Sequence, residues 1–231
     1  MMTSQPRSQA YFELVRSCCS DPAKQWIDRV YAQIGISSNT TAFAGAYAAA
    51  RRRLGTAAIT LDSDEESLVH NVNFPGLQWM TLEEVGRATL LLRATECLPP
   101  EDHTDFIRDV YQRGDNDERR ALLRALSILS DPPRHLAIAI EACRTNVQTV
   151  FEGIACENSY PFHYFPDKNF NQLVLKVLFT GVPLRRVMGL EQRITADLVR
   201  MTEDYASERR AARRFVPEDI ELITANQRVQ R

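Results

Sequence analysis

Apolar residues recur every three or four positions along most of this chain, which is the spacing of amphipathic α-helices. Helix signals punctuate the pattern: Thr81 followed by Glu84 forms a capping box, Pro99-Pro100 ends one helix, and Asp115 is placed to cap another. Helix starts in this region lie about 16–19 residues apart, so pairs of helices repeat roughly every 35 residues. The pattern predicts an all-α fold, either a right-handed stack of HEAT-like helical hairpins or an irregular helical bundle.

The pattern also divides the chain into four stretches of one structural domain. They are N-terminal helices (1–55), a long acidic connection (56–80), a helical-hairpin core (81–190), and a polar C-terminal helix and tail (191–231). The connection lacks a helical period, and we expect Phe74 and Trp79 to anchor it on the core. Its acidic cluster consists of Asp62, Asp64, Glu65 and Glu66.

The polar C-terminal helix carries only a thin apolar stripe. Arg193 and Asp197, and likewise Arg200 and Asp204, are spaced for ion pairs within one helix. We therefore expect a surface helix that lays one face on the body of the protein.

The unusual part of the chain is residues 156–179, CENSYPFHYFPDKNFNQLVLKVLF, which we call the signature segment. On a helical wheel, apolar residues from Phe170 to Phe179 cover about two-thirds of the circumference and leave only Gln172 and Lys176 as a polar strip. This pattern predicts a central, buried helix. Asn171 falls inside the apolar arc, so it needs hydrogen-bond partners, which we expect in the preceding loop.

The loop before that helix carries residues suited to such a structural role. Asp167 is placed to cap the helix, and each proline favours an extended conformation of the residue before it, Tyr160 or Phe165. Asn158 and Ser159 offer turn-type bonds to nearby backbone. The residues assigned to this structural role are Asn158, Ser159, Pro161, Pro166, Phe170 and Asn171.

A second interpretation places a ligand pocket at the N-terminus of the helix that begins near residue 167. Free N–H groups and the helix dipole favour an anionic ligand there. The candidate binding residues are Tyr160, His163, Asp167, Gln172 and Lys176. The pattern leaves open whether His163 faces the pocket or is buried as a neutral core histidine.

Composition and motifs narrow the functional classes. A net charge of −2 gives no general attraction to nucleic acid, and no apolar run is long enough to span a bilayer. The N-terminus lacks the apolar core of a signal peptide, so we expect a cytoplasmic protein. The five cysteines are scattered without zinc-site spacing, and no nucleotide, nucleophile-elbow or metalloprotease motif is present. We therefore expect no metal and no cofactor, and catalytic residues remain unknown.

The signature segment resembles the EboA-domain family. The similarity rests on Asn158-Ser159-Tyr160-Pro161, the Phe165-Pro166-Asp167 turn and Asn169-Phe170-Asn171-Gln172, and it continues into the sequence GVPL. Proteins of that family are encoded beside a TatD-like hydrolase, a UbiA-like prenyltransferase, a dehydroquinate-synthase-like enzyme and a sugar-isomerase-like enzyme. The resemblance implies a part in making or exporting a small secondary metabolite or its precursor, and it brings no established catalytic residue.

Two functions follow as hypotheses. The first is a non-catalytic accessory or scaffold protein of such a pathway, which works through contacts with pathway proteins. The alternative is a protein or enzyme that binds a small anionic metabolite in the pocket described above. The absence of a recognisable catalytic motif favours a non-catalytic protein over an enzyme and leaves the question open.

Overall fold

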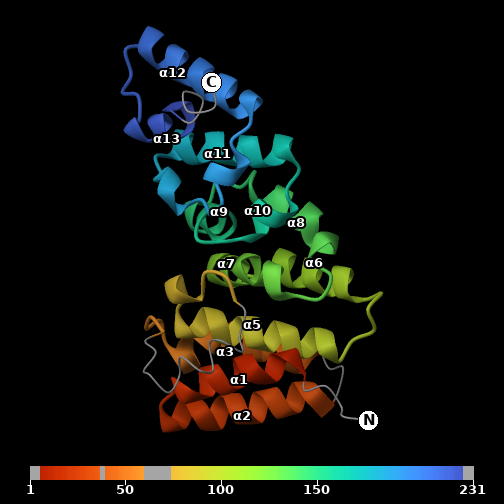
Figure 1. Cartoon of the computed structure of the whole chain (residues 1–231). Coiled ribbons are helices and arrows are strands. Elements are labelled where there is room, and N and C mark those ends of the chain that lie inside the picture. Colours follow the sequence, from red (N-terminus) through yellow and green to blue (C-terminus); the bar gives the residue numbers. More distant parts are fainter. Residues whose placement is uncertain (1–5, 37–39, 60–73, 226–231) are drawn as a thin grey trace.

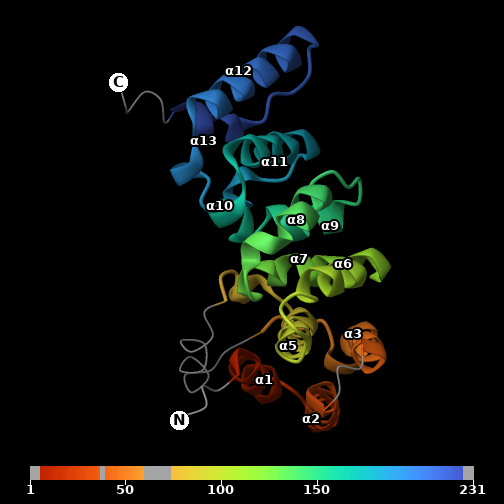
Figure 2. The same ribbon diagram turned by 90° about the vertical axis from the view of Figure 1, so that its right-hand side faces the viewer.

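A computed structural model describes residues 6–36, 40–59 and 74–225, and these residues form an elongated stack of helices (Figures 1 and 2). The helices follow one another along the long axis in nearly the order of the sequence, with α2 at one end and α12 at the other (Figure 1). The first helices are α1 (Arg7–Ser17), α2 (Asp21–Ile36), α3 (Thr40–Leu54), α5 (Leu82–Glu96), α6 (His103–Arg113) and α7 (Asn116–Ala125). They are followed by α8 (Leu136–Ala142), α9 (Gln148–Ala155), α10 (Tyr160–Tyr164), α11 (Asp167–Thr180), α12 (Ala196–Ala211) and α13 (Glu221–Thr224).

The all-α prediction is confirmed. Short 3₁₀ turns separate several helices, namely η1 (Leu77–Trp79), η2 (Leu126–Ile128), η3 (Pro132–His135), η4 (Leu184–Arg186), η5 (Glu191–Arg193) and η6 (Glu218–Ile220). Within the described ranges the only β-type pairing is an isolated bridge between Ala58 and Thr81. No helix in these ranges is long and apolar enough to cross a membrane.

Local capping signals fix the helix starts in the middle of the stack. Thr81 and Glu84 form the expected capping box at the start of α5. Asp115 accepts a hydrogen bond from the Glu118 backbone N–H at 2.8 Å and so caps α7. These caps satisfy N–H groups that lack a partner inside the helix.

One continuous hydrophobic core runs from Tyr11 in α1 to Ile223 in α13. Its most enclosed helix is α5, which buries residues 82–92 without interruption. Helix α11 packs into the core, as predicted, but the buried part of its circumference is narrower than expected. Phe179 is 72% exposed, although Val177 and Leu178 in the same turn are buried.

The connection 56–80 is anchored on only one of its two aromatic residues. Phe74 is buried as expected, whereas the Trp79 side chain is half exposed, and that prediction is wrong. Trp79 contributes its backbone instead, because its carbonyl accepts a hydrogen bond from Arg124 at 2.8 Å. The acidic cluster of the connection lies outside the described residues.

Close helix contacts depend on glycine at one position in the middle of the stack. A Cβ atom at Gly153 of α9 would lie 2.8 Å from Arg120 Cγ and 3.1 Å from Arg120 Cα in α7. Gly45 of α3, by contrast, has no atom within 4 Å of the corresponding Cβ position. The two helical glycines therefore form a matched pair.

We predict that Gly153→Ala lowers the free energy of unfolding by about 1–3 kcal/mol, because the methyl group forces α7 and α9 apart. Gly45→Ala should raise it by about 0.4–1 kcal/mol, because alanine restricts the unfolded chain and favours helix. Urea denaturation of both variants measures the difference. Equal effects of the two substitutions would contradict the close packing of α7 on α9.

Candidate functional site

The signature segment begins with a buried amide that ties three helices together. Asn158 donates from Nδ2 to the carbonyl oxygens of Leu123 at 3.0 Å and Gly153 at 2.8 Å. Its Oδ1 accepts from the Tyr160 backbone N–H at 2.9 Å, which is the turn-type bond expected from the sequence. Asn158 is 3% exposed and therefore joins α7, α9 and α10 inside the core.

The loop between Asn158 and α11 is more helical than predicted. Tyr160 begins the short helix α10 with Pro161 at the next position, so the expected extended conformation of Tyr160 is wrong. Proline fits the first turn of a helix because no backbone N–H is needed there. Phe165 is extended, as expected from Pro166. The Tyr160 hydroxyl donates to the Pro132 carbonyl at 2.6 Å, and burial raises the pKa of Tyr160.

Arg193, which the sequence did not single out for this role, binds the backbone carbonyls of this loop. Its guanidinium donates to the carbonyl oxygens of Phe162 at 2.6 Å and Phe165 at 2.8 Å. It also donates to Asp167 Oδ1 at 2.8 Å and lies over the Phe170 ring at 4.6 Å from the ring centre. The expected pairing of Arg193 with Asp197 is therefore wrong.

Asp167 does not cap α11. Pro166 occupies the capping position, and Asp167 is the first helical residue, with no side-chain bond to the helix backbone. A carboxylate in the first turn still interacts favourably with the helix dipole. Its side chain is 67% exposed and pairs with Arg193.

Asn171 is buried as predicted, but its partner is not the preceding loop. Its Nδ2 donates to Thr195 Oγ1 at 3.3 Å, and its Oδ1 has no hydrogen-bond partner. Thr195 Oγ1 also accepts from the Leu198 N–H at 3.1 Å and so caps α12. The amide thus joins α11 to the start of α12 through one long hydrogen bond.

The five candidate pocket residues do not meet at one position. Tyr160 is buried, and Asp167 is engaged with Arg193. His163 is exposed, and its Nδ1 donates to the Ser159 carbonyl at 2.9 Å. Gln172 is exposed on α11, and Lys176 lies farther along the same helix, where it donates to other carbonyls. The predicted pocket at the N-terminus of α11 is therefore not assembled.

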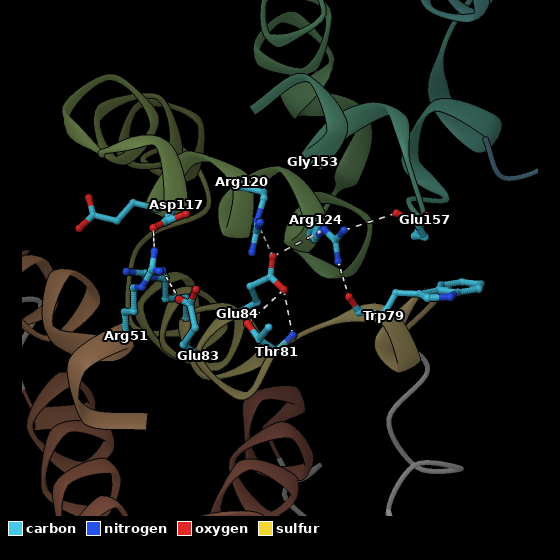
Figure 3. A network of polar contacts seen from close by, with 12 residues as sticks. Arg51, Trp79, Thr81, Glu83, Glu84, Asp117, Arg120, Arg124, Gly153 and Glu157 are labelled. Atoms are coloured by element: carbon cyan, nitrogen blue, oxygen red, sulfur yellow. Dashed lines mark hydrogen bonds and ion pairs between the residues drawn. The ribbon is translucent and has the colours of Figure 1, made fainter. Parts of the chain in front are cut away.

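A chain of alternating charges crosses the stack beside the signature segment (Figure 3). Glu84 is 1% exposed, and its Oε1 accepts from Arg120 Nε at 2.9 Å. The same oxygen lies 3.6 Å from Arg124 Nε, and Oε2 accepts from the Thr81 N–H at 2.9 Å. Arg124 then lies 3.5 Å from Glu157 Oε2, at the start of the signature segment.

The chain continues from Glu157 to the turn after α11. Arg186 donates to both Glu157 oxygens, at 2.6 Å and 3.0 Å, and to Glu152 Oε2 at 2.7 Å. The Glu157 N–H also donates to the Arg186 carbonyl at 2.8 Å. Glu157 itself adopts a left-handed backbone conformation with φ 48°, which turns the chain from α9 towards α10.

A second buried pair lies on α5. Glu83 and Arg87 are both 1% exposed and form an ion pair, and Arg87 Nε donates to the Tyr47 carbonyl at 3.0 Å. Burial raises the pKa of Glu83, and the Arg87 charge opposes that shift. For Glu152, burial also acts to raise the pKa, but the hydrogen bonds from Arg186 and Gln148 and nearby positive charges lower it overall.

These side chains were not identified from the sequence as a site. Glu83 and Glu84 fit the ordinary pattern of acidic residues in a first helical turn. No signal in the surrounding sequence showed their burial, because α5 is enclosed by helices that are distant from it along the chain. Because the charges are matched in pairs, the arrangement is suited to fixing helix positions. No group of three or more His, Cys, Asp or Glu side chains arranged to hold a metal occurs in the part of the chain that the structure describes.

The fold and this site define an elongated all-α protein whose middle layers are joined by buried ion pairs. A family model described as "Metabolite traffic protein EboA" matches residues 9–224. The chain therefore belongs to the EboA family, which confirms the resemblance noted in the signature segment. Searches of curated proteins and of solved structures found no match.

We predict that substitution by leucine, which has a similar volume, has effects of different size at the two buried asparagines of the signature segment. Asn158→Leu should lower the free energy of unfolding by about 2–4 kcal/mol, because two buried carbonyls and one N–H lose their partner. Asn171→Leu should change it by less than about 1 kcal/mol, because one long bond is lost and an unpaired oxygen is removed.

Chemical denaturation monitored by circular dichroism measures both values. A loss at Asn171 equal to that at Asn158 would show that the Asn171 amide has partners beyond Thr195.

Proposed function

We propose that this chain is a non-catalytic accessory protein of a secondary-metabolite biosynthesis or precursor-export pathway, and that it acts through contacts with other pathway proteins. The family description, metabolite traffic, supports the pathway. The elongated stack supports the mode of action, because stacked helices offer a long surface to a partner (Figure 2). The proposal includes a cytoplasmic location and a right-handed, HEAT-like arrangement of hairpins within one domain.

The observation that carries the proposal is an apolar groove between α11 and α12, with a volume of about 570 Å³. Its apolar walls are Leu175, Phe179, Met201 and Tyr205. Phe179 is 72% exposed, and an exposed aromatic side chain in a groove is typical of a surface that a partner covers. We call this surface the α11–α12 groove.

Charge at the groove indicates the chemistry of its partner. Asp204 and Glu208 of α12 line it, and both are exposed. Lys176 also lines it, but its Nζ donates to the carbonyls of Cys143 and Thr145 at 2.6 Å each. The groove is therefore suited to an apolar helix of a pathway protein that carries lysine or arginine beside its apolar face.

The buried polar groups support a non-catalytic role. The carboxylates of Glu84 and Glu157 are saturated by arginine and backbone donors. An acid or base in catalysis needs an accessible position next to a substrate. Of the five candidate pocket residues, Tyr160, His163 and Asp167 do not share a pocket with Gln172 and Lys176, which favours contact with proteins over chemistry at the signature segment.

We predict that Phe179→Ser weakens binding of a pathway partner at least about tenfold, because it removes the aromatic anchor of the groove. Each of the four enzymes encoded beside family members is purified and titrated against the chain by calorimetry. The matched control is Phe215→Ser, since Phe215 is equally exposed, at 72%, outside the groove.

The Phe215 variant should bind like the unmodified chain. Failure of all four enzymes to bind would contradict action through these pathway proteins. Equal weakening by both substitutions would contradict the α11–α12 groove as the contact surface.

A further inference from the structure

A separate hollow lies between the end of α8 and the polar strip of α11, with a volume of about 230 Å³. Its apolar lining comes from Ile140, Phe165 and Leu173. This volume is below the roughly 300–1,000 Å³ of typical ligand pockets, so it suits a fragment-sized molecule or one end of a larger one. The hollow is distinct from the predicted pocket, since Tyr160, His163 and Asp167 do not line it.

Two cationic side chains line the hollow, and no carboxylate is among its lining residues. Arg144 is exposed, and its side chain forms no hydrogen bond or ion pair with another described residue. The Lys176 ammonium has three N–H groups, two of which are occupied by the carbonyls of Cys143 and Thr145 at 2.6 Å. The ammonium also lies 4.6 Å from the centre of the Phe151 ring, so at most one lysine donor and a complete guanidinium remain for a ligand.

Amide side chains complete the polar part of the lining. Asn169 and Gln172 are three positions apart on α11, so their side chains lie on the same side of the helix. Both line the hollow. Neither side chain forms a hydrogen bond with another described residue. Their amides add donors and acceptors without adding charge.

We propose that this hollow binds the carboxylate end of a small organic acid, with Arg144 and Lys176 on the carboxylate and the apolar body of the acid against Ile140, Phe165 and Leu173. A guanidinium matches the two oxygens of a carboxylate with parallel donors. The apolar lining distinguishes an organic acid from an inorganic anion. This inference goes beyond the accessory role and does not depend on the α11–α12 groove.

Burial supports the assignment of Lys176. It lowers the pKa of this lysine, because the ammonium has lost part of its hydration without gaining a carboxylate partner. A bound carboxylate supplies the missing counter-charge and should raise that pKa.

The test is an NMR titration of the full chain with phenylacetate, a small aromatic acid whose size fits the hollow. We expect saturable shifts confined to residues 140–144 and 165–176, with a weak Kd of roughly 10⁻⁴–10⁻³ M for a ligand of this size. Arg144→Gln should weaken binding about five- to tenfold. The matched control is Arg185→Gln, since Arg185 is also an exposed arginine but lies outside the hollow, and it should leave binding unchanged.

Phenylacetamide and inorganic phosphate distinguish the parts of the proposal. Phenylacetamide lacks the charge and phosphate lacks the apolar body, so each should bind at least about tenfold more weakly. Absence of saturable binding, equal binding of either compound, or an unchanged Kd in Arg144→Gln would overturn the proposal. Phe179→Ser should not alter the titration, so the outcome is independent of partner docking.

Discussion

The structure depends most on a buried chain of alternating charges that runs from α5 through α7 to the signature segment. A buried carboxylate such as Glu84, at 1% exposure, is tolerated only because arginines and backbone donors surround it. Buried ion pairs add little net stability compared with apolar packing, but removing one partner leaves a charge without compensation, at a cost of about 3–5 kcal/mol. The chain therefore acts mainly by specifying which helices meet and in what register.

Glu157 belongs both to this chain of alternating charges and to the signature segment. It lies between Arg124 from α7 and Arg186 from the turn after α11, and its left-handed backbone directs the chain into α10. Asn158 then fixes the ends of α7 and α9, and Arg193 holds the carbonyls of the loop that follows. The signature segment is accordingly a joint between the middle and the C-terminal layers of the stack.

The sequence predicts the parts of this arrangement that depend on neighbouring residues. The caps at Thr81 and Asp115, the turn bond of Asn158 and the burial of Asn171 all follow from spacing within a few positions. The partners of Asn171 and of the loop carbonyls come from Thr195 and Arg193, more than twenty positions along the chain, so periodicity could not identify them. The sequence identifies Glu84 as a capping-box residue but not its contact with arginine, because its arginine partners belong to another helix. For the same reason, the five candidate pocket residues do not all meet: Gln172 and Lys176 line one hollow, whereas Tyr160, His163 and Asp167 do not line it.

The central claim is that Glu157 and Arg186 are energetically coupled and thereby hold the signature segment to the C-terminal layers. A double-mutant cycle with Glu157→Gln and Arg186→Met, measured by urea denaturation, tests this coupling directly. We expect a coupling free energy of about 1.5–3 kcal/mol, because the pair is bidentate and largely buried. Additive effects, with a coupling free energy within about 0.3 kcal/mol of zero, would contradict the account.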